Sequence, residues 1–193
     1  MDLKRIGQFC KRTKTVHIVL HPNSGALWVG NGTGMWLADD GVEITRENCG
    51  ALLDIDTGDM TVTEGDSAAD IYDGNRNLPD EDAADVLGCG IMEGKAYIAL
   101  SRGGECRVAL CPLDYAKAAA KEDTYRRYFL IGNEDSPVIA ITDGMMLKML
   151  VARLETEKAE EFLAMARRIG SLDSYQDDGP ATQTKMDMQE AGE

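Results

Sequence analysis

Three short stretches of this sequence combine residue types that could do chemistry. Residues 30–34, Gly-Asn-Gly-Thr-Gly, place three glycines within five positions, a pattern whose backbone N–H groups could bind a phosphate. The two histidines, His17 and His21, lie four residues apart, so on a strand they would share one face and could ligate a metal. Residues 54–59, Asp-Ile-Asp-Thr-Gly-Asp, resemble the start of a calcium-binding loop.

A plain structural interpretation is favoured for each stretch. A phosphate loop leads into a helix, usually through Gly-Lys-Ser/Thr, whereas a strand is predicted directly after residue 34. No third metal ligand accompanies the histidines, and in residues 54–59 the glycine comes one position early and the closing Glu is missing. Ser24, Ser101 and Ser136 fall at predicted turns without a visible partner base. We therefore expect no catalytic residue, no metal, no cofactor and no enzyme activity.

The basic side chains are the more informative set. Residues 1–16 carry five Lys or Arg and one Asp, a net charge of +4 in a chain whose net charge is -14. Two predicted helices, near residues 2–12 and 112–121, present cations opposite their apolar sides, which favours contact with a phosphate backbone without base recognition. A solvated helix face is the alternative, because Asp114, Glu122 and Asp123 dilute the second group. The candidate DNA-binding residues are Lys4, Arg5, Lys11, Arg12, Lys14, Lys117, Lys121, Arg126 and Arg127.

Composition predicts a soluble chain with one core. At 193 residues, 44% of them hydrophobic, one good core is expected, and 34 acidic against 20 basic side chains repel nucleic acid and anionic membranes on average. No apolar run approaches the roughly 20 residues of a membrane span, and residues 1–5 begin no signal peptide. We expect a cytoplasmic protein with no membrane partner. Five cysteines without a C-x-x-C pair indicate buried free thiols.

Hydrophobic periodicity in the first third of the chain predicts a helix followed by strands. Residues 2–12 repeat their apolar side chains at helical spacing. The segments "TVHIVLH", "ALWVG" and "MWLAD" then read as three strands rich in β-branched and aromatic residues. A short helix or loop at 46–53 and a strand in "DMTVTE" follow.

The same order recurs in the last part of the chain. "AYIALS" and "CRVALC" predict a hairpin around residues 102–104, and a proline opens a helix at 112–121. "RRYFLIG", "PVIAIT" and "MLKMLVARL" are three predicted strands, and residues 155–169 form a final amphipathic helix. Between the two parts, residues 54–85 hold eleven Asp or Glu against one Arg, which predicts a long solvated connection.

An internal repeat explains the glycine-rich stretch. Helix, strand, turn, strand, turn, strand occurs twice at an offset of 112 residues, so that Ser24 matches Ser136 and Gly32 matches Gly144. Asn31-Gly32 then falls on Asp143-Gly144, and both dipeptides are strong signals of type I′ hairpin turns. The glycines are therefore predicted to turn the chain.

This repeat resembles the domain of DNA sliding clamps. "RVALCPLDYAKAAAK" with the three strands after it looks like one half-module, and "LKRIGQFCKR" with its three strands looks like the other. The resemblance implies an α+β fold in which cationic helices face DNA, and clamp domains assemble into rings of six, so a homo-oligomer is considered. The expected domain spans 1–170, with half-modules at 1–62 and 89–154, an acidic connection at 63–88, the helix at 155–169, and a disordered acidic tail at 171–193.

The layout "ALWVGNGTGMWLADDGVEITRENCGALLDID" is also similar to uncharacterised proteins of prophages and mobile elements in Gram-positive bacteria. Together the two resemblances imply a non-enzymatic, phage-related clamp-like accessory protein that binds double-stranded DNA non-specifically through its basic helix faces. The alternative is a protein–protein interaction module on the same scaffold, with replication or host proteins as partners and no DNA contact.

Overall fold

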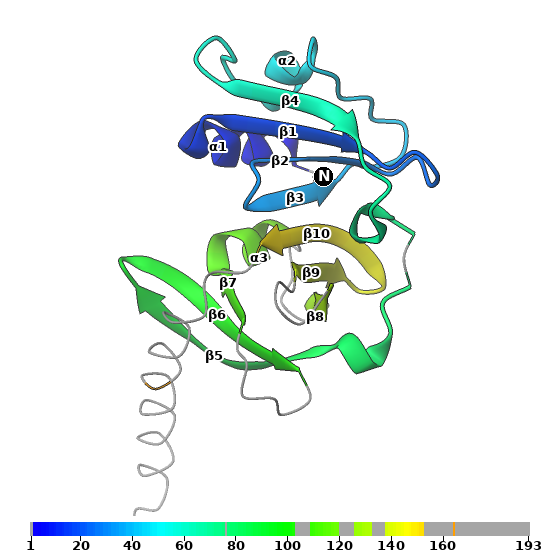
Figure 1. Ribbon diagram of the computed structural model, residues 1–193. Helices are drawn as coiled ribbons and strands as arrows, with labels where there is room; N and C mark the ends of the chain where they lie inside the picture. Colours follow the sequence, from blue (N-terminus) through cyan, green and yellow to red (C-terminus); the bar gives the residue numbers. More distant parts are fainter. Residues whose placement is uncertain are drawn as a thin grey trace, which may run out of the picture.

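A seven-stranded sheet forms the centre of the molecule, as the computed structural model shows (Figure 1). Its strands run in the order β4-β1-β2-β3-β10-β9-β8. Neighbouring strands are antiparallel except β1 and β4, which are parallel. The strands are β1 (Thr15–Leu20), β2 (Leu27–Gly30), β3 (Gly34–Leu37), β4 (Thr61–Asp66), β8 (Arg126–Ile131), β9 (Val138–Asp143) and β10 (Met146–Ala152).

Short helices and a second, three-stranded sheet complete a mixed α+β fold, the class predicted from the sequence. The structure describes residues 2–75, 77–102, 109–119, 126–132 and 138–152, together with Ala164. Apart from Ala164, the predicted helix at 155–169 lies outside this part, as do the tail at 171–193 and Lys121. The remaining elements are α1 (Leu3–Thr13), α2 (Cys49–Leu53), α3 (Leu113–Ala119), β5 (Ala84–Met92), β6 (Lys95–Arg102), β7 (Ala109–Pro112) and the 3-10 turns η1 (Asp70–Tyr72) and η2 (Asp80–Asp82).

Helix α1 forms where the periodicity predicts it. The Asp2 side chain accepts a hydrogen bond from the backbone N–H of Arg5 at 3.1 Å and so caps the first turn. Lys14 ends the helix in a left-handed conformation, with its N–H bonded to the carbonyl of Cys10. Ile6, Phe9 and Cys10 are buried against the sheet. This packing stabilises a helix of eleven residues, a length that is only marginally helical in isolation.

Three strands lie on each side of the β3–β10 pairing, and β4 lies beyond β1 without a counterpart beyond β8 among the described residues. The three strands after α1 and the three after α3 meet where β3 pairs with β10, Met35 lying opposite Leu150. The pair Gly30–Met35 of the β2–β3 hairpin has its counterpart 112 residues on, in the pair Thr142–Leu147. The β1–β2 and β8–β9 pairings do not keep this offset and differ by two residues in register.

The glycine-rich stretch is a hairpin turn, as predicted, but of a different type. Asn31 and Gly34 are joined by a backbone hydrogen bond of 3.1 Å, so Gly32 and Thr33 are the central residues. Gly32 has φ +81° and Thr33 has no positive φ, the pattern of a type II′ turn and not of the predicted type I′. Gly144, with φ +62°, occupies the same first position between β9 and β10.

A buried amide joins the elements on the helix side of the sheet. Asn31 is 5% exposed; its Nδ2 donates to the carbonyl of Phe9 at 3.2 Å and to the Tyr115 hydroxyl at 3.0 Å. Its Oδ1 accepts the backbone N–H groups of Thr33 and Gly34. One side chain thus links α1, the β2–β3 turn and α3. Burial raises the pKa of Tyr115, so its hydroxyl stays protonated in this network.

The described residues of the acidic connection, 63–88, are exposed or half-buried, and a few of its apolar side chains contact the sheet. Tyr72 lies edge-on to Trp28, and the indole N–H of Trp28 donates to the Tyr72 carbonyl at 2.7 Å. Ile71 and Leu78 join the same apolar cluster on the face opposite the helices. From residue 84 onward the chain forms β5, so the second sheet begins earlier than the half-module predicted from 89.

Three of the four described cysteines are buried free thiols, as predicted, and Cys89 is exposed. Burial raises the pKa of Cys10 and of Cys111 from 9.0 to about 12. Both thiols therefore stay protonated near neutral pH and pack as small apolar groups.

Replacing Asn31 with Ala is expected to lower the free energy of unfolding by about 3 kcal/mol, because it leaves backbone groups of α1 and the turn without partners. Urea unfolding followed by circular dichroism measures this loss. Asn23→Ala, at an exposed turn, is the matched control and should change stability by less than about 0.5 kcal/mol. Equal losses in the two variants would contradict the role given to Asn31.

Alkaline pH should weaken the fold through the two deeply buried thiols. An unfolded cysteine loses its proton near pH 9, whereas Cys10 and Cys111 keep theirs to about 12 in the folded chain. Their contribution is complete below pH 9 and falls above it, by at most about 1.4 kcal/mol per pH unit and thiol. Urea unfolding at pH 8 and pH 10.5 tests this, and Cys10→Ala with Cys111→Ala should flatten the dependence. An unchanged dependence in that variant would refute it.

Candidate nucleic-acid interface

Helices α1 and α3 pack on the same face of the sheet, and the contacts between them show that they run antiparallel. The guanidinium of Arg5, near the start of α1, donates to the carbonyl of Lys117, near the end of α3, at 3.1 Å. Arg12, at the other end of α1, forms an ion pair of 3.0 Å with Asp114 in the first turn of α3. Arg12 also stacks over the Phe9 ring. The two arginines are therefore ties between the helices.

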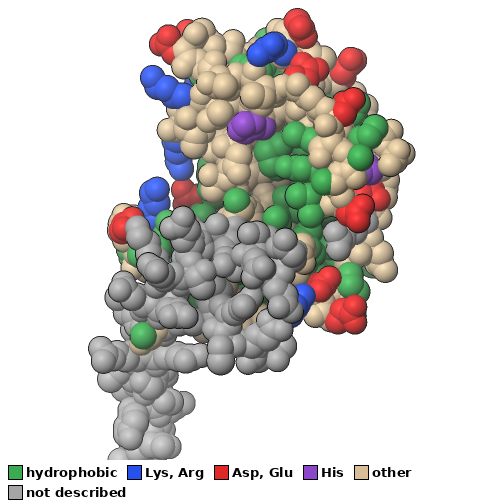
Figure 2. All heavy atoms as spheres, in the orientation of Figure 1, with side chains coloured by type: hydrophobic (Ala, Val, Ile, Leu, Met, Phe, Trp, Pro, Cys, Tyr) green, Lys and Arg blue, Asp and Glu red, His purple; other side chains and the backbone are tan. Residues whose placement is uncertain are grey.

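The lysines of α1 point away from these ties. Lys4, Lys11 and Lys14 are exposed, and Lys4 lies 3.8 Å from Asp54 in a pair that is mostly solvated on both sides. A pair of this kind contributes little to stability and leaves the ammonium accessible. Lys117 is exposed on α3. Figure 2 shows Lys and Arg side chains along the edge of the molecule where Figure 1 places the two helices.

The surface around the helices carries a modest positive charge. Six predicted cations lie on α1, its C-cap and α3, and Lys148 in β10 adds a seventh, against five carboxylates, those of Asp2, Asp39, Asp54, Asp114 and Asp143. The Asp2 carboxylate is turned to the backbone of α1, where it accepts the N–H of Arg5. The net charge of +2 on the described residues of this surface contrasts with -14 for the whole chain. A local attraction for phosphates is therefore compatible with an acidic protein.

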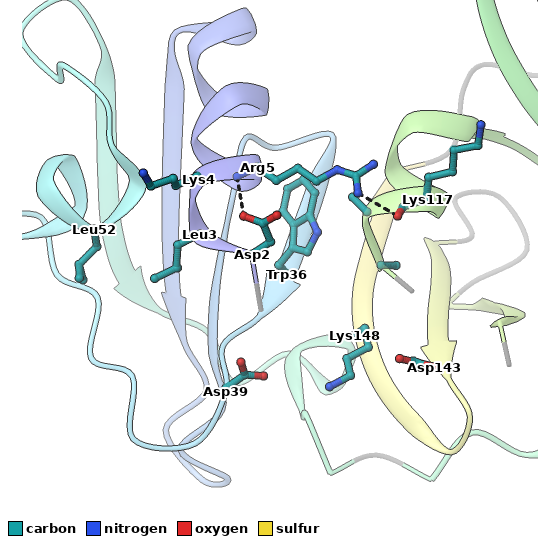
Figure 3. Close-up of a pocket in the computed structure, with 12 residues that line it drawn as sticks. Asp2, Leu3, Lys4, Arg5, Trp36, Asp39, Leu52, Lys117, Asp143 and Lys148 are labelled. Carbon is teal, nitrogen blue, oxygen red and sulfur yellow. Dashed lines mark hydrogen bonds between the residues drawn. The ribbon is translucent and has the colours of Figure 1, made fainter. Parts of the chain in front are cut away.

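A groove of about 810 Å³ opens between the start of α1, the end of α3 and the β9–β10 hairpin (Figure 3). Its lining mixes apolar side chains with both charges, and Figure 3 shows Lys148 and Asp39 pointing toward one another across it. Lys148, in β10, is a cation of this surface that sequence reasoning missed. The polar lining residues are Asp2, Lys4, Arg5, Asp39, Lys117, Asp143 and Lys148, and the apolar ones are Leu3, Trp36, Leu52, Ala118 and Ala119.

The predicted set does not form one cluster, because Arg127 lies apart from the helices. Its guanidinium pairs with Asp80 at 2.6 Å and stacks over Phe129, which belongs to the apolar cluster on the opposite face of the sheet. Arg126 is half-buried at the start of β8. The structure therefore brings together Lys4, Arg5, Lys11, Arg12, Lys14 and Lys117, and adds Lys148.

The histidines are held by hydroxyl partners. His17 Nδ1 lies 2.6 Å from the Thr63 hydroxyl, and the buried His21 has its Nδ1 2.7 Å from that of Ser24. Within the described residues, no group of three His, Cys, Asp or Glu side chains is placed to hold a metal ion. His17 is held by a contact between β1 and β4, and His21 by a contact within the β1–β2 turn.

Comparison with known proteins adds no family. No family model, curated protein or solved structure matches the chain. In the part of the chain that the structure covers, no helix has the length and apolar character needed to cross a membrane.

Proposed function

We propose that this chain is a non-enzymatic, clamp-like accessory protein that binds the backbone of duplex DNA through the lysines of α1 and α3. The observation that carries the proposal is the antiparallel pairing of the two helices on one face of a continuous sheet. The resemblance to prophage proteins suggests a role for such binding in phage or mobile-element replication.

The division between arginines and lysines supports this proposal. Arg5 and Arg12 reach across from α1 to α3, and a planar guanidinium suits such directed contacts. Among the described residues no ion pair is seen for Lys11, Lys14 or Lys117. Flexible ammonium groups of this kind neutralise phosphates and release counterions without reading bases.

Duplex DNA should bind in a strongly salt-dependent and sequence-independent way. If Lys4, Lys11, Lys14 and Lys117 each neutralise one phosphate, the slope of log K against log salt is about -3.6. Fluorescence anisotropy with a labelled duplex, between about 0.1 and 0.3 M salt, measures it. Replacing Lys4, Lys11 and Lys117 with Glu should abolish binding while leaving the arginine ties in place.

Single charge reversals provide the matched control. Lys11→Glu should weaken binding about tenfold and reduce the slope by about 0.9, because one phosphate contact is lost. Lys95→Glu alters the net charge equally but lies at the start of β6, in the other sheet, and should change affinity less than twofold. The proposal fails if the unaltered protein shows no salt-dependent binding, or if the two reversals act alike.

The mode of binding depends on the number of copies in a particle. Light scattering after gel filtration, over a range of protein concentrations and at low and moderate salt, measures the mass. A closed hexamer would make encirclement of DNA the working mode, by analogy with the clamps that the repeat resembles. A monomer at every concentration would leave binding to one side of the duplex, through α1 and α3 alone.

A protein-binding role without DNA contact is the second candidate. The observation that favours it is the groove, whose apolar floor and mixed charges suit a polypeptide better than a uniformly anionic backbone. The DNA titration separates the two candidates, because only the first predicts saturable binding that salt abolishes.

A further inference from the structure

Strand β5 presents an open edge. It pairs with β6 from Ala84 to Met92, and within the described residues no strand pairs with its other side. An isolated bridge between Ala83 and Phe129 lies just before it. Backbone N–H and C=O groups along such an edge can accept a further strand.

The side chains of β5 are unusually apolar for an exposed edge. Val86 is 53% exposed, Leu87 45% and Ile91 69%, and Cys89 is exposed too. Natural edge strands are commonly protected by Lys or Pro, and the nine residues of β5, "ADVLGCGIM", contain neither. A bulge between Val86 and Gly88 interrupts the first half and leaves Gly88 to Met92 as the regular segment.

The exposed apolar residues other than Leu87, which lies in the bulge, share one face of the strand. Val86, Cys89 and Ile91 lie opposite Leu100, Ile98 and Ala96 of β6, which alternate on a single face. Leu100 and Ile98 are buried in the main core, so the row on β5 continues that core outward to the edge. Asp85 pairs with Ser101 and points to the other face. A strand added beside β5 would meet an apolar face on one side and a carboxylate on the other.

The charge of this region decides between partners. Residues 80–95 contain five Asp or Glu and one Lys, a net charge of -4. Two of these carboxylates are paired, Asp80 with Arg127 and Asp82 with Arg102, and with these two arginines counted the region keeps a net charge of -2. A second copy of the chain, paired edge to edge, would bring two such acidic segments together, which is unfavourable. A basic segment would be attracted.

We propose that β5 binds an extended segment of a partner protein in which apolar and basic residues alternate, added to the sheet as a fourth strand. Alternation places the partner's apolar side chains beside Val86 and Ile91 and its basic ones on the face of Asp85. The backbone supplies affinity and the two faces supply selectivity. This surface shares no residue with the lysines of α1 and α3.

A fluorescent peptide alternating Lys with Val or Ile tests this site with the full-length protein. Saturable binding is expected by anisotropy, with Ile91→Lys weakening it about tenfold by adding a protective charge to the edge. Met145→Lys, at a 99% exposed methionine in the β9–β10 turn, is the matched control and should leave the affinity within about twofold. Circular dichroism checks that both variants fold.

A peptide of the same sequence, N-methylated at alternate residues, separates strand pairing from charge. It keeps the side chains and loses the donors, so at least tenfold weaker binding is expected. Equal binding of the two peptides would mean charge attraction only and would overturn the proposal. So would the absence of binding up to about 1 mM peptide. A protein dimer that Ile91→Lys dissociates would assign the edge to a second copy instead.

Discussion

The arrangement of the two helices depends on one buried amide. Asn31 bonds to the end of α1 through Phe9, to its own hairpin, and to α3 through Tyr115. An amide offers both donors and acceptors, and here both kinds are used, so neither a carboxylate nor an apolar side chain could replace it. Because this contact sets the spacing of the helices, Arg5 and Arg12 can reach across from one to the other.

Periodicity alone could not separate the cations of α1. The 3.6-residue repeat assigns Arg5 and Arg12 to the same polar arc as Lys4 and Lys11, and in the structure all four do lie away from the sheet. What divides them is α3, which the chain reaches about 100 residues later. A helical wheel gives the angle of a side chain about its own axis and contains nothing about what packs beside that axis. The contacts of Arg5 and Arg12 with α3 could therefore not be predicted from the sequence.

Sequence patterns that act within a few residues predicted the secondary structure correctly, whereas features carried by one or a few side chains were missed. The apolar repeat of residues 2–12, the strand segments and the hairpin glycines are signals that act within a few residues, and they predict the elements that the structure shows. The eleven carboxylates of the acidic connection predict solvation, and its described residues are exposed or half-buried, but composition could not show that Ile71, Tyr72 and Leu78 contact the sheet. Strand β5 was not predicted, because its bulge interrupts the alternation of side chains that indicates a strand. Lys148 was not predicted as part of the basic surface, because a single lysine in an apolar strand does not indicate which surface it lies on.

The surface of α1 and α3 and the region of residues 80–95 carry local charges of opposite sign. At about 0.15 M salt the Debye length is roughly 8 Å, so the field of distant carboxylates is largely lost at the helices. The local charge there is positive although the chain is acidic, whereas residues 80–95 are locally negative. Two surfaces of opposite sign can then attract unlike partners without competing.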